Sequence, residues 1–545
     1  MAMHFNLADL FEKVADTVPD REALVCGQQR STFAQLESRA NQLAHYLLSQ
    51  GIGFGDHVGL YMYNSAEFIE AMWACFKIRA VPVNVNYRYV QEELRYIFDN
   101  ADLVACFHNR EFVPHIEQIK DQISGLKTLI SVDDGTDFDL DRIGAIDFSA
   151  ALSGQPQQRD FEERSDDDLF LLYTGGTTGM PKGVMWPHKN LFMAAMGGGG
   201  FFTGNGPAET PEAIVDRISD FPIRGMALAP LMHGACWWYA CIQLLSGCCL
   251  LLNPNRSLDG EQIWQMVEDE KINGLSIVGD AMAIPLLDAL EANKDRWDLS
   301  SIFNIGSGGA VFSPAKQQQF IEFFPNVFIT NSFGSSESGN MGFDSGNNKK
   351  TGTSSLGNVI KSETMSVITD IEGEPHRHAE IGEEGIFASS GNIPIGYYGD
   401  AEKTAKTFVE VDGQRWLLTG DAACLESDQS ITIFGRGSNC INTGGEKVFP
   451  EEVEQALKHH PAVFDALVVD TPHPRWGNQV TAVVQIRDGH QLDLQGLNQL
   501  ARQHIADYKV PRELHIVAEL PRAPSGKPNY PQAKKIALST TYLVK

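Results

Sequence analysis

A glycine- and threonine-rich run at residues 173–183 has residue types that suit the binding of a polyphosphate. It reads Tyr-Thr-Gly-Gly-Thr-Thr-Gly-Met-Pro-Lys-Gly and follows the apolar stretch 168–172, which we expect to be a buried strand. The glycines allow positive φ angles, so successive N–H groups can point at one anion, and Lys182 adds a charge. The run lacks the Walker A order of Gly, Lys and Ser/Thr. The alternative is an ordinary Gly/Thr-rich surface turn.

Three further segments place a polar or charged group beside a turn. Asp421 ends an expected strand, where its carboxylate can accept both hydroxyls of a ribose or act as a common turn residue. The loop 521–528 is too rich in proline for a helix and presents one lysine, Lys527, whose ordinary role would be solvation. His233 stands among aromatic residues, as a satisfied core histidine often does.

The glycine-rich run and four later segments resemble, in order, the motifs of the adenylate-forming superfamily, which includes the acyl-CoA synthetases. The resemblance spans nearly the whole chain, and five motifs in the family's order make coincidence very improbable. The matching segments are 173–183, 332–337, 418–421, 434–454 and 521–527.

The resemblance implies an α/β fold of the acyl-CoA synthetase type. A large N-terminal domain of helix-covered β-sheets, 1–436, would bind ATP and the acyl substrate, and a small mobile α+β domain, 437–545, would carry the catalytic lysine loop. Residues 437–440 would form the hinge, where Ser438 replaces the usual Asp or Lys. We expect this hinge still to pivot, because a hinge needs backbone freedom more than a particular side chain.

The resemblance also assigns a nucleotide site. Lys527 and Thr178 would act in adenylation, and Glu337 would be the metal ligand that holds Mg²⁺ on the outer phosphates. Phe333 replaces the family's tyrosine, so adenine can still stack there while a phenol contact is lost. The residues expected to contact ATP or AMP are Thr174, Gly175, Gly176, Thr177, Thr178, Gly179, Lys182, Gly308, Gly309, Ser332, Phe333, Gly334, Ser335, Ser336, Asp421, Arg436 and Lys527.

Acyl and CoA contacts follow from the same resemblance. His233 would position the acyl carboxylate for catalysis, and the glycines of 443–447 would let the pantetheine arm of CoA pass close to the backbone. The expected acyl pocket consists of His233, Trp237, Trp238, Gly308 and Gly309. The expected CoA contacts are Gly444, Gly445, Lys447 and Trp476.

These parts imply an ATP-dependent acid–thiol ligation in two steps. The carboxylate would attack the α-phosphate of ATP, giving an acyl-adenylate and pyrophosphate, and the CoA thiol would then attack the acyl carbonyl and release AMP. Lys527 would bridge the carboxylate and the α-phosphate in the first step, then be withdrawn by rotation of the small domain. Because charge accumulates on phosphate oxygens, catalysis rests on alignment and electrostatic stabilisation.

Several other functions share part of this pattern. A carrier-protein-loading adenylation domain is disfavoured because the chain stops shortly after Lys527, and nothing visible supplies the oxygen chemistry of a luciferase-like oxidoreductase. A nucleotide-binding pseudoenzyme is disfavoured because Lys527, Glu337 and Asp421 are retained. A ligase for an aryl or other acid remains the alternative for the substrate.

The composition favours a globular protein that binds small molecules over one that binds nucleic acid. Its 545 residues are 43% hydrophobic with a net charge of −27, which repels nucleic acid and requires local cations for ATP and CoA. Nine cysteines without a C-x-x-C pair indicate reduced thiols in the cytoplasm, with Cys248 and Cys249 in the core. We expect no signal peptide and no transmembrane segment, while peripheral membrane contact and a homodimer stay open.

The elements that must position these groups alternate between helix and strand. Thr32 should cap a helix that ends at Gly51, and the strands 58–62 and 81–85 flank a second helix. This β-α-β order predicts sheets covered by helices. Near the C-terminus, Pro450 should begin a helix of the small α+β domain.

The identity of the acid is suggested by segments 173–186, 391–398 and 435–454. They resemble bacterial fatty-acyl-CoA ligases that act on steroid side chains more than aryl-CoA ligases. Glycines at 197–200 and at 306, 308 and 309 remove side chains where a pocket wall would run, although 197–200 could instead be a turn. We therefore expect a long-chain fatty acid or a steroid with a carboxylated side chain.

Overall fold

The structure is a computed structural model in which the chain divides into two compact units. It describes residues 3–89, 91–174, 180–310, 312–345, 359–371, 373–436, 439–443, 446–473, 477–505, 507–522, 527–539 and 543–544. The first unit comprises Met1–Phe312, Gln319–Asn347 and Asn392–Thr407. The second comprises Ser313–Gln318, Asn348–Gly391 and Phe408–Lys545.

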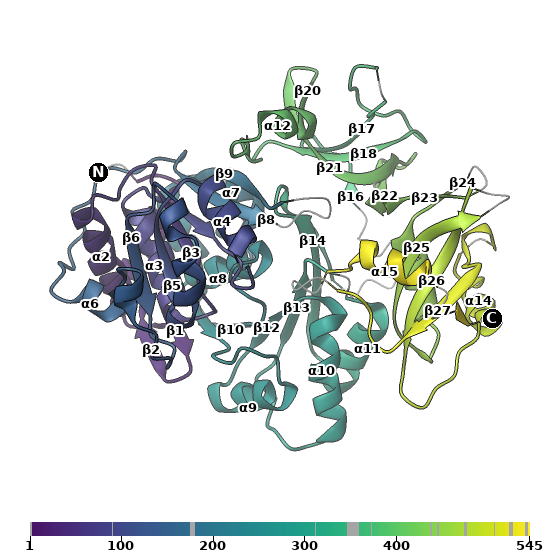
Figure 1. Ribbon diagram of the computed structural model, residues 1–545, viewed down its shortest axis with the longest axis horizontal. Coiled ribbons are helices and arrows are strands. Elements are labelled where there is room, and N and C mark those ends of the chain that lie inside the picture. Colours follow the sequence, from purple (N-terminus) through teal and green to yellow (C-terminus); the bar gives the residue numbers. More distant parts are fainter. Residues whose placement is uncertain are drawn as a thin grey trace. The chain divides into compact units, whose positions relative to one another are not determined.

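One sheet of the first unit carries the glycine-rich run. Its strand order is β19-β9-β8-β4-β3-β5-β6-β7, parallel from β8 to β7 and antiparallel where β9 joins β8 and β19; β3, β5, β6, β8 and β9 are labelled in Figure 1. The strands are β3 (His57–Tyr61), β4 (Val81–Asn84), β5 (Leu103–Asn109), β6 (Thr128–Val132), β7 (Ile146–Asp147), β8 (Leu169–Thr174), β9 (Lys182–Pro187) and β19 (Gly396–Tyr397).

Helix α2 (Phe33–Ser49) begins at the cap that the sequence predicts. The Thr32 side chain accepts a hydrogen bond from the Gln35 N–H, and the Gln35 side chain accepts one from the Thr32 N–H, which completes a capping box. Every helix in the described part of the chain is too short or too polar to cross a bilayer. The first helices are α1 (Leu7–Thr17), α2 (Phe33–Ser49), α3 (Ala66–Lys77), α4 (Gln91–Asn100), α5 (Val113–Glu117), α6 (Phe148–Leu152) and α7 (His188–Ala195).

The other sheet of the first unit has the order β15-β14-β13-β12-β10-β11-β1-β2 and is parallel except at its two edge pairs. The strands are β1 (Glu22–Cys26), β2 (Gln29–Thr32), β10 (Arg224–Ala227), β11 (Cys249–Leu252), β12 (Gly274–Ile277), β13 (Asn304–Gly308), β14 (Phe328–Ser335) and β15 (Gly339–Ser345). The associated helices are α8 (Gly234–Leu245), α9 (Gly260–Glu270) and α10 (Gly279–Ala292), while α11 (Pro314–Phe323) is divided between the two units, since Ser313–Gln318 belongs to the second. Cys248 and Cys249 are buried here, as predicted.

The two faces of this second sheet differ in side-chain size. One face packs large apolar residues, among them Met226, Leu275, Ile305 and Ile329, into a core. Because side chains alternate along a strand, the intervening residues point to the other face, which we call the small-residue face. It consists of Gly225, Ala227, Gly274, Ser276, Asn304, Gly306, Gly308, Thr330 and Ser332, and from Ser276 onward each of these residues is partly exposed.

The second unit contains two sheets. The first has the order β16-β22-β21-β18-β17 with β20 on β21, and the second has the order β24-β23-β26-β27-β28 with β25 on β26. Their strands are β16 (Val359–Ile360), β17 (Met365–Ile368), β18 (Glu384–Ser390), β20 (Phe408–Val411), β21 (Gln414–Leu425), β22 (Ser430–Arg436), β23 (Ile441–Thr443), β24 (Glu446–Val448), β25 (Val463–His473), β26 (Gly477–Ile486), β27 (Glu513–Val517) and β28 (Leu543–Val544).

Three helices accompany the second of these sheets. They are α13 (Pro450–Lys458), α14 (Leu494–Ala501) and α15 (Tyr530–Ala537), while α12 (Ala401–Thr407) belongs to the first unit. Pro450 occupies the first turn of α13 with Glu451 and Glu452, as predicted for a helix start. Residues 408–436 group with the second unit, and the predicted domain boundary between 436 and 437 stays a prediction.

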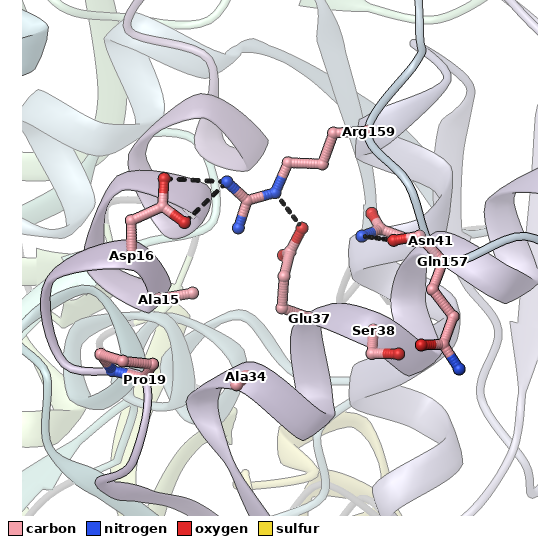
Figure 2. Close-up of a pocket in the computed structure, with 9 residues that line it drawn as sticks. All are labelled: Ala15, Asp16, Pro19, Ala34, Glu37, Ser38, Asn41, Gln157 and Arg159. Carbon is pink, nitrogen blue, oxygen red and sulfur yellow. Dashed lines mark hydrogen bonds and ion pairs between the residues drawn. The ribbon is translucent and has the colours of Figure 1, made fainter.

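A pocket of about 400 Å³ lies between α1, α2 and the segment 157–159 (Figure 2). Arg159 spans it, with its guanidinium 2.8 Å from Asp16 and 2.6 Å from Glu37. Glu37 also accepts from Lys77, whose side chain is fully buried, at 2.7 Å. The pocket contains none of the predicted site residues, so this ion-paired surface is not the candidate active site.

Candidate active site

The predicted phosphate-binding run connects two antiparallel strands. Thr174 of β8 pairs with Lys182 of β9, so the two ends of the run lie side by side on antiparallel strands. The Lys182 ammonium contacts the Asp400 carboxylate, and this hydrogen bond lowers the pKa of Asp400 below its usual range. Thr174 and Lys182 thus lie at the two ends of the run, and the contact with Asp400 holds the Lys182 side chain in place.

A buried asparagine fixes the base of the same run. Asn84, at the end of β4, accepts a hydrogen bond from the Tyr173 N–H at 2.7 Å and donates to the Tyr173 carbonyl at 2.9 Å. It also donates to the Met232 carbonyl at 2.6 Å. One side chain therefore ties the strand before the phosphate run to the residue before His233.

Glu337 lies in the turn between β14 and β15 and is held from two sides. The Tyr397 hydroxyl donates to Glu337 Oε1 at 3.0 Å, and the indole N–H of the buried Trp186 donates to the Ser336 carbonyl at 2.8 Å. A carboxylate fixed in this way fits Mg²⁺, a hard ion that proteins hold with one or two carboxylates and substrate phosphates.

The predicted adenine segment runs along the end of β14. Ser332 donates to the Ser307 carbonyl at 3.0 Å, and a Cβ on its strand partner Gly308 would lie 2.6 Å from the Ser332 Oγ. The Phe333 ring lies over Gly342, where any Cβ would be 2.8 Å from the ring. A Cβ on Gly334 would overlap the Gly339 carbonyl oxygen. Close packing of backbone therefore sets the shape of this segment.

His233 immediately precedes α8 and is partly exposed. Its carbonyl accepts the Trp237 N–H at 3.0 Å, so the helix begins at this residue. Trp237 stacks on Phe170 with ring centroids 4.2 Å apart and is 1% exposed, which is the environment of a core residue. Trp238 is also buried, and its ring packs against Gly234. The predicted roles of His233, Trp237 and Trp238 in an acyl pocket stay predictions.

The two glycine groups have different surroundings. A Cβ at Gly197 would meet Phe201, one at Gly198 would meet Pro207, and one at Gly200 would overlap the Asn205 carbonyl oxygen. The idea that the run 197–200 leaves room for a ligand is therefore wrong, because its own loop fills that space. A Cβ at Gly306 would lie 3.0 Å from the Thr330 hydroxyl and one at Gly308 would lie 2.6 Å from the Ser332 hydroxyl, whereas at Gly309 the nearest atom is the Ala235 Cβ at 3.9 Å, so of these three glycines only Gly309 has open space beside it.

The predicted ribose pair lies on neighbouring strands of the second unit. Asp421 of β21 pairs with Arg436 of β22, which brings the two backbones side by side, while the Arg436 side chain lies outside the described residues. The expectation that Asp421 ends a strand is wrong. β21 continues to Leu425, because residues 422–425 keep pairing with β22.

The lysine loop is closed at its base. Arg522 forms a backbone bridge with Pro528, and the Asn529 N–H donates to the Pro521 carbonyl at 3.1 Å. The Arg522 guanidinium contacts the Asp465 carboxylate, which Lys458 also holds at 2.8 Å. Lys527 is exposed near the end of this loop, whose base these contacts hold together.

Comparison with known proteins decides the family. The model for the AMP-binding enzyme family matches residues 11–398, and the model for the AMP-binding enzyme C-terminal domain matches residues 452–527. The chain belongs to the AMP-binding enzymes. This confirms the resemblance that the ordered motifs predicted.

Curated relatives cover nearly the whole AMP-binding enzyme. A 3-oxocholest-4-en-26-oate–CoA ligase from Rhodococcus rhodochrous is 45% identical over 98% of this chain and 96% of its own length. A medium/long-chain-fatty-acid–CoA/3-oxocholest-4-en-26-oate–CoA ligase from Mycobacterium marinum is 44% identical over 98% and 97%. The medium-chain acyl-CoA ligase Mig of Mycobacterium avium is 38% identical over 98% of both chains.

Solved structures confirm the predicted fold class. The anthranilate CoA ligase AuaEII in complex with anthranoyl-AMP has a TM-score of 0.82 at 23% identity, with 98% of each chain covered. ATP-bound MatB from Rhodopseudomonas palustris has a TM-score of 0.80 at 23% identity, covering 98% of this chain and 99% of its own. The AMP-binding enzyme thus has the α/β fold of these structures.

Several predicted residues of the AMP-binding enzyme lie outside the described part of the chain and stay predictions. They are Gly175, Gly176, Thr177, Thr178 and Gly179 of the phosphate run, the hinge residue Ser438, and the CoA contacts Gly444, Gly445 and Trp476. The side chain of Lys447 is likewise not described.

The buried carboxyl group of Glu454 contacts Tyr530, the first residue of the helix that follows the lysine loop. Glu454 of α13 accepts the Val468 N–H at 2.9 Å and the Tyr530 hydroxyl at 3.3 Å, and Tyr530 begins α15 just after the loop. Burial raises the pKa of Glu454 to about 8, helped by Glu451 and Asp465 and opposed by Lys458. The folded chain therefore keeps this side chain neutral at pH 7.

We expect Glu454→Gln to change how stability depends on pH. Because folding raises the pKa from 4.5 to about 8, this carboxyl's contribution is fully present below pH 4.5 and is lost as the pH rises through 8. Glutamine mimics the neutral acid and does not titrate. As the pH rises from 4.5 to 8, the unfolding free energy of the variant should therefore increase by roughly 3–5 kcal/mol relative to that of the wild type. Calorimetry across this pH range measures the difference, and a difference that does not vary with pH would contradict the prediction.

Proposed function

We propose that this AMP-binding enzyme is an ATP-dependent acyl-CoA ligase for a large apolar carboxylic acid, either a long-chain fatty acid or a steroid with a carboxylated side chain. The observation that carries the proposal is the 44–45% identity, over 98% of the chain, to ligases named for 3-oxocholest-4-en-26-oate. The name of the M. marinum relative adds medium- and long-chain fatty acids.

In the first half-reaction a carboxylate oxygen of the substrate bonds to the α-phosphorus of ATP, and the bond from that phosphorus to the pyrophosphate breaks. Lys527 would bridge the carboxylate and the α-phosphate, and Thr174, Thr178 and Lys182 would hold the departing phosphates. Glu337 would hold Mg²⁺, which supplies charge neutralisation on the outer phosphates. Asp421 and Arg436 would fix the ribose.

In the second half-reaction the CoA sulfur bonds to the acyl carbon, and the bond from that carbon to AMP breaks. Lys527 must leave the acyl carbonyl for the thiol to reach it, so a pivot at Ser438 would exchange the lysine for the CoA-facing residues Gly444, Gly445, Lys447 and Trp476. His233 would position the acyl group, since Asn84 fixes the backbone just before it.

The small-residue face supports the proposal of a large acid. It begins at Gly308, beside the adenine segment, and continues along β13 to Asn304, about 13 Å away at 3.3 Å per residue. No bulky side chain projects from this face in the described strands β12 and β13, where its members are glycine, serine and asparagine. A long or polycyclic tail could lie on it with its carboxylate at the Gly308 end.

The test is a comparison of substrates. Pyrophosphate release and CoA-ester formation should be measured with 3-oxocholest-4-en-26-oate, palmitate, benzoate and acetate, and the first two should give the larger kcat/KM. Preference for benzoate or acetate would overturn the proposal. A higher kcat/KM for palmitate than for the steroid acid would support a fatty acid as the substrate and exclude the steroid acid.

A further inference from the structure

Two polar side chains of α8 meet at the far end of the small-residue face. Gln243 is 0% exposed, and neither its amide oxygen nor its amide nitrogen completes a hydrogen bond with the described residues. A buried amide without partners costs free energy. A glutamine at such a place calls for a physical explanation, since an apolar side chain would fill the same space without that cost.

Tyr239 lies one turn before Gln243 and points to the same spot. A Cβ on Gly225 would overlap both the Gln243 amide and the Tyr239 hydroxyl, and one on Gly274 would lie 3.6 Å from that hydroxyl. Both glycines belong to the small-residue face and pair with each other across β10 and β12. Burial raises the pKa of Tyr239, so the phenol stays protonated and can donate.

The spacing places this pair at the end of the face remote from the reacting carboxylate. His233 precedes Tyr239 by six residues and Gln243 by ten, which is about 9 and 15 Å along a helix. On the sheet, Gly274 pairs with Asn304, the far end of β13 from Gly308. Tyr239 is also partly exposed, whereas Gln243 is fully buried.

We infer that Tyr239 and Gln243 form a polar subsite that recognises a carbonyl or hydroxyl oxygen at the end of the substrate remote from its carboxylate. This inference rests on the proposed function and narrows its substrate class to acids that carry such a distal oxygen. Tyr239 would donate to that oxygen, and the Gln243 amide, held against Gly225, would orient the phenol. A purely hydrocarbon tail would leave both groups unsatisfied, so the pair would disfavour it.

The experiment compares one steroid acid with its own deoxygenated form. The substrates are 3-oxocholest-4-en-26-oate and the same acid with a methylene in place of the ring ketone, with palmitate as a third substrate. For the wild type we expect a higher kcat/KM with the ketone. In Tyr239→Phe and in Gln243→Leu, the ratio of kcat/KM for ketone over methylene should fall about 10-fold, as expected for one lost hydrogen bond in a dry site.

The matched control is Tyr508→Phe, which removes a phenol from the exposed turn Asp507–Lys509 and should leave the ratio unchanged. Equal kcat/KM for both steroid acids in the wild type would overturn the inference, and so would equal losses for both acids in the variants. A wild type that esterifies palmitate but neither steroid acid would also overturn it while leaving the fatty-acid function intact. Thioester formation from none of the three would instead defeat the proposed function itself.

Discussion

Replacing Lys527 by alanine should abolish adenylation and spare the second half-reaction. The lysine would contact the α-phosphate as negative charge develops there, and loss of one preorganised electrostatic contact typically costs on the order of 10²–10³ in rate. Its support is local, because Arg522 bridges Pro528 and the Asp465 carboxylate holds the Arg522 guanidinium. Alanine removes the ammonium without disturbing either contact.

The two half-reactions can be measured separately. Acid-dependent pyrophosphate release reports adenylation, and CoA-ester formation from a presynthesised acyl-adenylate reports thiolysis. Lys535→Ala is the matched control, since it removes an exposed lysine from α15, the helix that follows the loop. Equal losses of K527A in both assays would contradict the division of labour between the two steps.

The elements of the fold that could be predicted are those set by contacts within a few residues. The capping box at Thr32, the proline in the first turn of α13 and the apolar strand before the phosphate run all occur where the sequence places them. Each depends on caps, fixed φ angles or alternation that a short window of sequence contains. The catalytic motifs could be predicted for a different reason, because their order resembles that of a known family.

The groups that support the site could not be predicted in the same way. Asn84, Tyr397 and Asp400 contact Tyr173, Glu337 and Lys182 from segments that are 60 or more residues away in the chain. A sequence shows that such residues are polar but not which partner the fold brings to them. Tyr397 had one signal, since it lies in the family-like segment 391–398.

Two errors have a common physical cause. From the sequence, the glycines 197–200 indicate either room for a ligand or a turn, of which the first is preferred for the substrate, and the strand that contains Asp421 is predicted to end at this residue. In the structure, Asn205 and Pro207 of the same loop fill the space beside the glycine run. The strand β21 continues past Asp421 because β22 offers further backbone partners. Both outcomes depend on what packs against a segment, which glycine content and residue type do not reveal.

Gly334→Ala should reduce kcat/KM for ATP in adenylation by about 100-fold. Gly334 sits where the β14–β15 register shifts, and a Cβ there would overlap the Gly339 carbonyl oxygen. Backbone cannot yield as a flexible side chain does, because Ser335 and Gly339 are paired across the two strands. The segment must therefore move, and a displacement of about 1 Å near the reacting groups can cost 10²-fold.

The displacement would reach Glu337 through the turn. The Glu337 N–H donates to the Ser335 Oγ at 3.3 Å, and the Glu337 carboxylate accepts from Tyr397, so moving Ser335 strains both contacts. Gly206→Ala is the matched control, since a Cβ there meets nothing within 4 Å. Steady-state kinetics with varied ATP, alongside thermal melts of both variants, measures the effect. Wild-type kcat/KM in a G334A protein that melts normally would show that the adenine segment does not depend on this close approach.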